Sequence, residues 1–98
     1  MEGGSIPSSK HTEAKARIKN KAGIHARPAS ILVQIASRYK STIQIKSKGK
    51  IADAKSILMI MSLNLTYNTD IVISADGYDS EEAVSKLTKF IESGCREI

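Results

Sequence analysis

One short segment of the chain combines residues that could bind and transfer a phosphoryl group. The run Gly23-Ile24-His25-Ala26-Arg27-Pro28-Ala29 places an imidazole two residues before a guanidinium, with a proline directly after it. Proline is tolerated in the first turn of a helix, so His25 should lie at a loop–helix junction and Arg27 in that first turn. A helix N-terminus offers unpaired N–H groups, and the arginine fork suits phosphate. The segment therefore predicts an anion-binding site.

The chemistry expected of His25 follows from the charge around it. The positive end of a helix dipole disfavours a protonated ring, so a neutral imidazole can use its lone pair to attack phosphorus. Once the ring carries phosphate, the N–H groups and Arg27 stabilise the new negative charge. The alternative is a capping or packed histidine beside a surface arginine, as most single histidines of small domains are. Spacing alone leaves both interpretations open.

Composition limits the class of protein. The 98 residues suffice for one domain, and 41% hydrophobic and 26% charged residues are typical of a globular chain. With one Phe, three Tyr and no Trp, the core must be aliphatic. One Cys and two His exclude the usual four-ligand zinc cluster, and no cofactor is indicated. No Ser-His-Asp set, acid–base pair or G-x-x-x-x-G-K loop indicates a complete hydrolase or a nucleotide-binding enzyme.

Charge and hydropathy indicate a cytoplasmic protein with no membrane insertion. The longest apolar run, Ile57–Met61, is far shorter than the ~18–20 residues that span a bilayer. The N-terminus shows no signal-peptide pattern, and the single Cys95 fits a reducing compartment. A net charge of +5 can steer acidic partners. Nucleic acid is the alternative use, but no aromatic residues accompany Lys46, Lys48 and Lys50, so we expect no nucleic-acid partner.

Hydrophobic periodicity predicts the elements that position the segment. Residues 1–14 show no apolar period and are predicted to form a flexible tail, with the folded domain over 15–98. Within the domain, periodicity predicts strands and helices alternating in the order β-α-β-β-α-β-α. The predicted strands lie at 14–19, 42–46, 51 onward and 70–75, and the helices at 28–39, 57–65 and 79–94. This order indicates an α+β fold with helices on one face of a sheet.

Two details of these elements can be tested. The segment 57–65 is ambiguous between strand and short helix, but Ser56 is a good N-cap residue and favours a helix. The last helix begins at Asp79, which we expect to cap it, with Glu81 and Glu82 at the favourable end of its dipole. Gly94 is expected to end it.

The segment 23–29 resembles the active-site signature of HPr, the histidine-containing phosphocarrier of the bacterial phosphoenolpyruvate–sugar phosphotransferase system. The segment 55–63, Lys-Ser-Ile-Leu-Met-Ile-Met-Ser-Leu, resembles the regulatory-serine segment of that family. The two motifs lie at the family's spacing, and the resemblance runs from about Lys15 to about Cys95. It implies an open-faced β-sandwich, in which a four-stranded antiparallel sheet is covered on one face by three helices.

The resemblance also implies a function. His25 would accept a phosphoryl group that enzyme I takes from phosphoenolpyruvate and would pass it to a IIA domain of a sugar permease. The phosphate would sit on Nδ1, and Arg27 would stabilise it during transfer. The protein would be a monomeric covalent relay rather than a stand-alone catalyst. The alternative is a regulatory binding module of the same fold that acts through Ser56, although the presence of His25 argues against it.

Further residues take roles from the resemblance. Ser56 would be phosphorylated by a dedicated kinase and dephosphorylated by a phosphatase, and the simpler interpretation is that it only caps a helix. The implied docking residues come from two helices: Ser30, Gln34, Ser37, Ile57, Leu58 and Met61. Core packing is the alternative for some of them, notably Ile57.

The chain departs from the family pattern at three positions. Asn64 and Asn68 stand where glycine is common, and asparagine is the residue that best replaces glycine at positive φ. Met59 replaces a residue that is frequently small.

Overall fold

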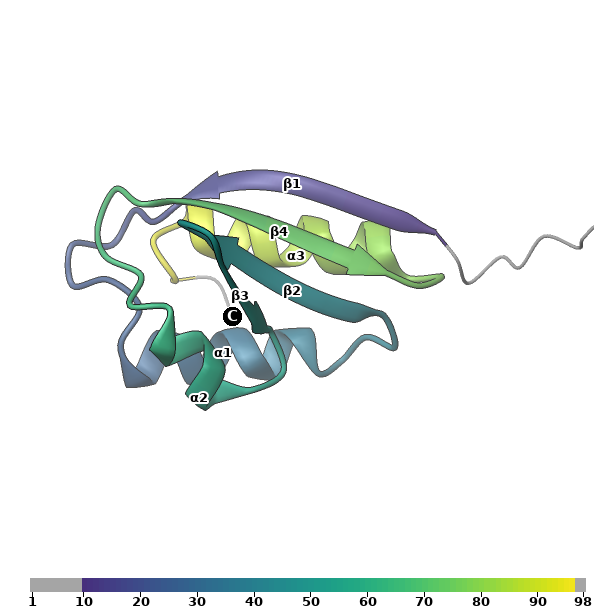
Figure 1. The fold of residues 1–98 in the computed structure, drawn as a ribbon, viewed down its shortest axis with the longest axis horizontal. Coiled ribbons are helices and arrows are strands. Elements are labelled where there is room, and N and C mark those ends of the chain that lie inside the picture. The colour runs from purple at the N-terminus through teal and green to yellow at the C-terminus, as the bar shows by residue number, and fades with distance from the viewer. Residues whose placement is uncertain (1–9, 97–98) are drawn as a thin grey trace, which may run out of the picture.

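The structure, a computed structural model, describes residues 10–96, which form four strands and three helices (Figure 1). The elements are β1 (His11–Arg17), α1 (Ala26–Ala36), β2 (Thr42–Ser47), β3 (Lys50–Asp53), α2 (Ile57–Ser62), β4 (Asp70–Asp76) and α3 (Ser80–Glu92). Their order confirms the predicted β-α-β-β-α-β-α arrangement. None of the helices within the described residues is long and apolar enough to cross a membrane.

The four strands form one antiparallel sheet in the order β1-β4-β2-β3. β4 is one of its two central strands, and there Ile73 lies opposite Ala14 of β1 on one side and Ile45 of β2 on the other. All three helices lie on the same side of the sheet, and α3 packs along β1 and β4 (Figure 1). No helix of residues 10–96 covers the other face of the sheet, which confirms the open-faced β-sandwich.

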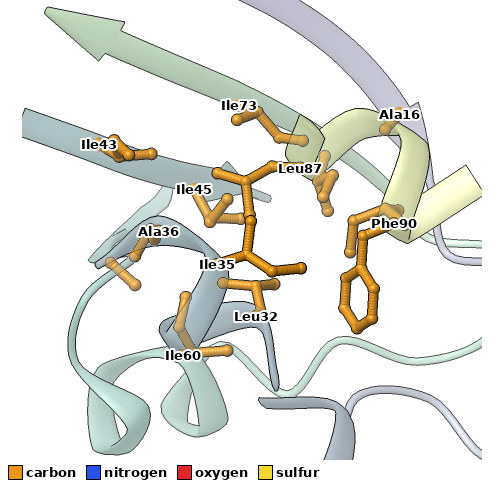
Figure 2. Close-up of a cluster of buried hydrophobic side chains, with 14 of the residues drawn as sticks. Ala16, Leu32, Ile35, Ala36, Ile43, Ile45, Ile60, Ile73, Leu87 and Phe90 are labelled. Carbon is orange, nitrogen blue, oxygen red and sulfur yellow. The ribbon is translucent and has the colours of Figure 1, made fainter. Parts of the chain in front are cut away.

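The core between sheet and helices is almost wholly aliphatic, as the composition predicts. Alternate residues of the strands point into it, among them Ile45 and Ile73, and meet Leu32 and Ile35 of α1 (Figure 2). Phe90 of α3 is fully buried at the same place. Each such side chain contributes about 1.5–3 kcal/mol by leaving water. The core therefore fixes α1, and with it the segment that carries His25, against the sheet.

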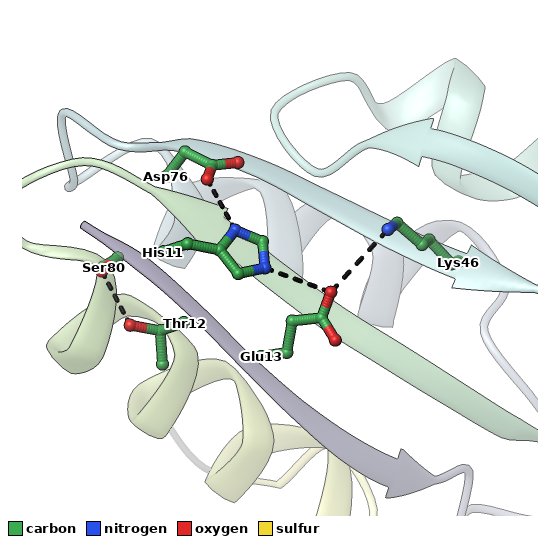
Figure 3. Close-up of polar contacts among 6 residues, drawn as sticks. All are labelled: His11, Thr12, Glu13, Lys46, Asp76 and Ser80. Atoms are coloured by element: carbon green, nitrogen blue, oxygen red, sulfur yellow. Dashed lines mark hydrogen bonds and ion pairs between the residues drawn. The ribbon is translucent and has the colours of Figure 1, made fainter. Parts of the chain in front are cut away.

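The predicted flexible tail over residues 1–14 is wrong for its last residues, because β1 begins at His11. Residues 11–14 pair with β4, and His11 lies opposite Asp76. The apolar period fails here because Thr12 and Ala14 are small, but Thr12 shares a 2.8 Å hydrogen bond with Ser80 of α3 (Figure 3). The part of the predicted tail over residues 1–9 lies outside the described residues.

His11 is exposed, as expected, but it is paired. Its Nδ1 lies 2.6 Å from Asp76 and its Nε2 lies 3.1 Å from Glu13 (Figure 3). The hydrogen bond to Asp76, and next the one to Glu13, raises the pKa of His11 above its ordinary value. A raised pKa means that this contribution to stability is present below about pH 6.5 and is lost as the pH rises through the folded-state value.

Asp79 stands at the N-cap position of α3, but its side chain makes no capping bond, so the expected cap is wrong. The carboxylate instead accepts hydrogen bonds from the N–H of Lys40 at 2.8 Å and the N–H of Ser41 at 3.0 Å, and from the Ser41 hydroxyl. It therefore ties the start of α3 to the loop between α1 and β2. Burial alone would raise the pKa of Asp79, but these bonds outweigh it and hold that pKa below its ordinary value.

Replacing Asp79 with asparagine should make the free energy of unfolding depend less on pH in the acid range. A carboxyl group with a lowered pKa contributes stability that is present above its unfolded pKa, about 3.9, and lost as the pH falls through the folded value. We expect wild type to lose more stability than D79N between about pH 5 and about pH 2. Urea denaturation across that range measures the difference. Asp70, whose pKa Arg17 lowers, contributes equally to both proteins. Parallel curves would contradict the assignment.

Candidate functional site

His25 occupies the N-cap position of α1, as the sequence predicts, although α1 begins at Ala26 rather than at Pro28. Its backbone is extended, with φ −97° and ψ −165°, and its side chain makes no capping hydrogen bond. The residue is exposed. The alternative of a packed or capping histidine therefore fails, and the ring is accessible to another macromolecule.

The first turn of α1 is arranged to receive an anion beside the imidazole. The backbone N–H groups of Ala26 and Arg27 have no hydrogen-bond partner within residues 10–96, and Pro28 has no N–H to offer. The first bond of the helix runs from the N–H of Ala29 to the carbonyl of His25, at 3.0 Å. The Arg27 residue is exposed, and the first turn holds no acidic residue. Two backbone donors and one guanidinium are thus available next to the ring.

Charge along the sequence strengthens this arrangement. Between Ala14 and Ala52 the chain carries ten lysines and arginines and no aspartate or glutamate. That stretch runs from β1 through the His25 loop and α1 to the β2–β3 hairpin. Three of these ten pair with acidic residues elsewhere in the fold: Arg17 with Asp70, Lys19 with Glu92 and Lys46 with Glu13. The others form no salt bridge within residues 10–96, and such positive charge attracts acidic surfaces and speeds their encounter. Among the described residues no group of three or more His, Cys, Asp or Glu could hold a metal ion.

The loop before His25 is held in place by its backbone. The N–H of Gly23 donates to the carbonyl of Asn20 at 3.0 Å, and the N–H of Ile24 donates to the carbonyl of Leu65 at 2.8 Å. Gly23 has a φ of +76°, and a Cβ at this position would lie 2.7 Å from the Leu65 carbonyl oxygen. Glycine is therefore required here both for its conformation and for lack of space.

Sequence reasoning missed one residue of this loop. The side-chain amide of Asn20 donates to the carbonyl of Gly23 at 2.5 Å, and its oxygen faces the thiol of Cys95, with 3.6 Å between Sγ and Oδ1. Burial raises the pKa of Cys95 to about 11, so the thiol keeps its proton at neutral pH. An asparagine three residues before a glycine indicates only a turn, so no local pattern could have shown these contacts.

Ser56 caps α2, which settles the ambiguity over the segment 57–65 in favour of a short helix. Its hydroxyl oxygen accepts a hydrogen bond from the N–H of Met59 at 3.3 Å, and the residue is half-buried. Such a cap contributes about 1 kcal/mol. After the helix, Asn64 and Asn68 adopt φ values of +54° and +69°, so the backbone expected for glycine is retained.

The implied docking residues all reach the surface. Within α2 only Ile60 is buried, whereas Ile57 is 37% exposed, Leu58 78% and Met61 41%. The core alternative for Ile57 is therefore wrong. α2 lies beside α1 (Figure 1), where Gln34 and Ser37 are exposed and Ser30 is half-buried. Apolar side chains of α2 and short polar side chains of α1 thus belong to neighbouring helices.

Two further apolar side chains were not predicted for this surface. Met59 is 43% exposed, and Tyr67, in the loop after α2, is 51% exposed. Ile60 is the residue that α2 buries, and Met59, directly before it, lies on the exposed side of the helix. We call the exposed apolar residues Ile57, Leu58, Met59 and Met61 the α2 patch.

Comparison with known proteins agrees with this geometry. The family model described as the HPr component phosphorylation site of the phosphotransferase system matches residues 12–93. The HPr-like protein Crh of Bacillus subtilis is 36% identical over 80 residues, which are 82% of this chain and 94% of Crh.

Solved structures agree as well. HPr of Thermoanaerobacter tengcongensis is 44% identical with a TM-score of 0.83, covering 89% of this chain and 98% of that one. The phosphocarrier protein HPr of Bacillus anthracis is 37% identical with a TM-score of 0.80, covering 83% and 96%. The family match spans nearly all of the folded residues, and the relatives share both sequence and fold, so the chain belongs to the HPr family.

Proposed function

We propose that this protein is a phosphoryl carrier of a sugar phosphotransferase system. His25 accepts a phosphoryl group from enzyme I, which takes it from phosphoenolpyruvate, and passes it to a IIA domain of a sugar permease. The observation that carries the proposal is the exposed His25 ring at the start of α1, beside the free N–H groups of Ala26 and Arg27. Membership of the HPr family supports it.

The proposed reaction uses the ring as a nucleophile in both directions. The lone pair of the neutral imidazole, on Nδ1, attacks phosphorus, and the bond between phosphorus and the donor breaks as the P–N bond forms. Most of the catalysis of phosphoryl transfer is positioning and charge stabilisation. The N–H groups of Ala26 and Arg27 and the Arg27 guanidinium face the phosphoryl oxygens during transfer. The reverse sequence delivers the group to the IIA domain, so the protein is a relay and not a self-sufficient catalyst.

Two surface features support docking of acidic partners. Of the ten basic residues between Ala14 and Ala52, all but Arg17, Lys19 and Lys46 form no salt bridge within residues 10–96. The α2 patch offers apolar area, and its methionine side chains adapt to more than one partner. We propose that Ser30, Gln34 and Ser37 of α1 complete the docking surface with this patch. Contacts of this type exchange rapidly, as a relay between two partners requires.

The test is incubation of the protein with enzyme I and phosphoenolpyruvate. We expect the intact mass to rise by one phosphate, the modification to be lost in acid, and peptide mapping to place it on His25. Absence of any phosphate would overturn the carrier proposal and favour a regulatory module.

We propose regulation through Ser56 as a second function. Two observations favour it. The relative Crh is described in its solved structure as a catabolite repression protein. In this chain, the half-buried Ser56 lies directly before the α2 patch. A phosphate there adds about two negative charges beside apolar docking residues, which opposes binding of acidic partners.

A serine kinase of the HPr-regulating type should phosphorylate wild type and leave Ser56→Ala unmodified. Mass spectrometry of both proteins after incubation with the kinase measures this. Because the substitution removes the α2 cap, we also expect the free energy of unfolding to fall by about 1 kcal/mol. Ser56→Thr keeps a hydroxyl and the cap, and should remain a substrate. Phosphate on S56A, or none on wild type, would contradict regulation at this residue.

We propose a monomer that acts in the cytoplasm. Pairing of β1 with β4 over seven residues, and packing of α3 against both strands, complete the fold within one chain. Dimers are described for some relatives, namely a domain-swapped Crh and an HPr dimer of Thermoanaerobacter tengcongensis. Sedimentation of this protein distinguishes the two states.

A further inference from the structure

The peptide group between Gly23 and Ile24 is held at both of its ends. Its carbonyl, on Gly23, accepts from the side-chain amide of Asn20 at 2.5 Å. Its N–H, on Ile24, donates to the carbonyl of Leu65 at 2.8 Å. This peptide lies one residue before His25, whose ring has no side-chain hydrogen bond within the described residues to orient it. The direction in which the imidazole leaves the backbone therefore depends on how this peptide is fixed.

Of the two bonds, the one to Asn20 is the only one made by a side chain. The Leu65 carbonyl is backbone, and the Gly23 position admits no Cβ against it. The same Asn20 also accepts the N–H of Gly23 with its own carbonyl, so it closes the turn from both its backbone and its side chain. Neither bond involves the N–H groups of Ala26 and Arg27 or the side chain of Arg27.

The orientation of the Asn20 amide is set from the far end of the sequence. An amide can face its neighbours in two ways, and here Oδ1 receives the Cys95 thiol while the NH₂ group faces Gly23. Cys95 is held by the turn that ends α3, in which its N–H donates to the carbonyl of Phe90 at 2.9 Å and Gly94 has a φ of +79°. The end of α3 is thereby linked through Asn20 to the His25 loop.

We propose that Asn20 is a positioning residue for phosphoryl transfer: it fixes the Gly23–Ile24 peptide and so aims His25 at the donors of α1, with Cys95 orienting its amide. The transfer part of this inference rests on the proposed function, whereas the effect on the peptide does not. Misplacement of a reacting group by a fraction of an ångström slows a step that depends on alignment.

The decisive variant is Asn20→Asp, which keeps the shape of the side chain and removes its donor to Gly23. Hydrogen exchange, followed by NMR, reports whether the Ile24 amide loses protection, and the rate of labelling by enzyme I reports alignment of His25. Thr12→Val is the matched control, because it deletes one part-buried side-chain hydrogen bond at the opposite end of β1. All rates are compared at a temperature at which every protein is fully folded.

In N20D we expect exchange of the Ile24 amide to be roughly tenfold faster, and labelling by enzyme I roughly tenfold slower, than in wild type. Both rates of T12V should lie within about twofold of the wild-type rates. Cys95→Ala should show a smaller change of the same kind, and Cys95→Ser, whose hydroxyl also donates, should restore both values. If N20D does not fold, the comparison of C95A with C95S still tests the inference.

Two results overturn the inference: N20D that matches T12V in both measurements, or C95A and C95S that behave alike at the Ile24 amide. Failure of the carrier function gives a different pattern. Wild type itself would then take up no phosphate, while the exchange of the Ile24 amide would still decide the role of Asn20.

Discussion

A protein in which His25 is replaced by alanine should take up no phosphate from enzyme I. The phosphoryl group needs a nucleophile at the start of α1, and the neighbouring Ala26, Arg27 and Pro28 offer none. The substitution leaves the fold intact, because His25 is exposed and makes no capping bond. Such surface changes alter stability by only about 0.5 kcal/mol. Intact mass and label incorporation after incubation with phosphoenolpyruvate measure the loss, and thermal unfolding confirms the fold.

The chain offers a matched control in its only other histidine. His11 is exposed like His25, but it lies in β1 and is bonded to Asp76 and Glu13. The variant His11→Ala should therefore label at the wild-type rate. Retention of acid-labile phosphate in His25→Ala, or its loss in His11→Ala, would place the acceptor elsewhere and contradict the site described above.

Within residues 10–96 the His25 ring has no hydrogen-bond partner, which fits the proposed carrier role. A phosphoryl group that must be surrendered cannot be held too firmly, and here the stabilising groups are backbone donors and one exposed arginine rather than a buried ion pair. The loop before His25 is fixed by hydrogen bonds, whereas the ring itself has no hydrogen-bond partner within the described residues. Preorganised donors of this kind need no rearrangement when the charge arrives.

Local patterns predicted the elements whose period is regular. Alternation at Ile43 and Ile45 and at Ile71 and Ile73 located β2 and β4, because each strand buries one face. The N-cap residue Ser56 identified α2 correctly. The start of α1 was placed two residues late, because proline is tolerated throughout the first turn and so does not mark the first helical residue.

The remaining errors concern contacts between distant residues. The pairing of the first residues of β1 was not predicted, because Thr12 and Ala14 are small and give a weak apolar period; these residues are ordered by pairing with β4. Asp79 looked like a cap in sequence, yet its carboxylate is used by Lys40 and Ser41, 39 and 38 residues away. The contact of Asn20 with Cys95 joins residues 75 apart. Such pairs carry no periodic signal, so only the fold shows them.

Replacing Gly23 with alanine should destabilise the protein and slow labelling of His25 together. Two effects add at this position. A non-glycine residue at positive φ costs about 1–2 kcal/mol. The new Cβ would also lie 2.7 Å from the backbone oxygen of Leu65, which cannot swing away as a side chain would. Forcing atoms into a filled space costs about 1–3 kcal/mol. We therefore expect about 3 kcal/mol in total and a displaced His25 loop.

Gly49 separates these two effects. It also has positive φ, +81°, but nothing lies within 4 Å of a Cβ built there, and it belongs to the β2–β3 hairpin rather than to the His25 loop. Gly49→Ala should therefore lose only the conformational part, about 1–2 kcal/mol, and label at the wild-type rate. Urea denaturation and initial labelling rates of both variants give the comparison. If the two variants lose equal stability and label equally fast, the close approach of Leu65 does not constrain the loop, and another feature must hold His25 in place.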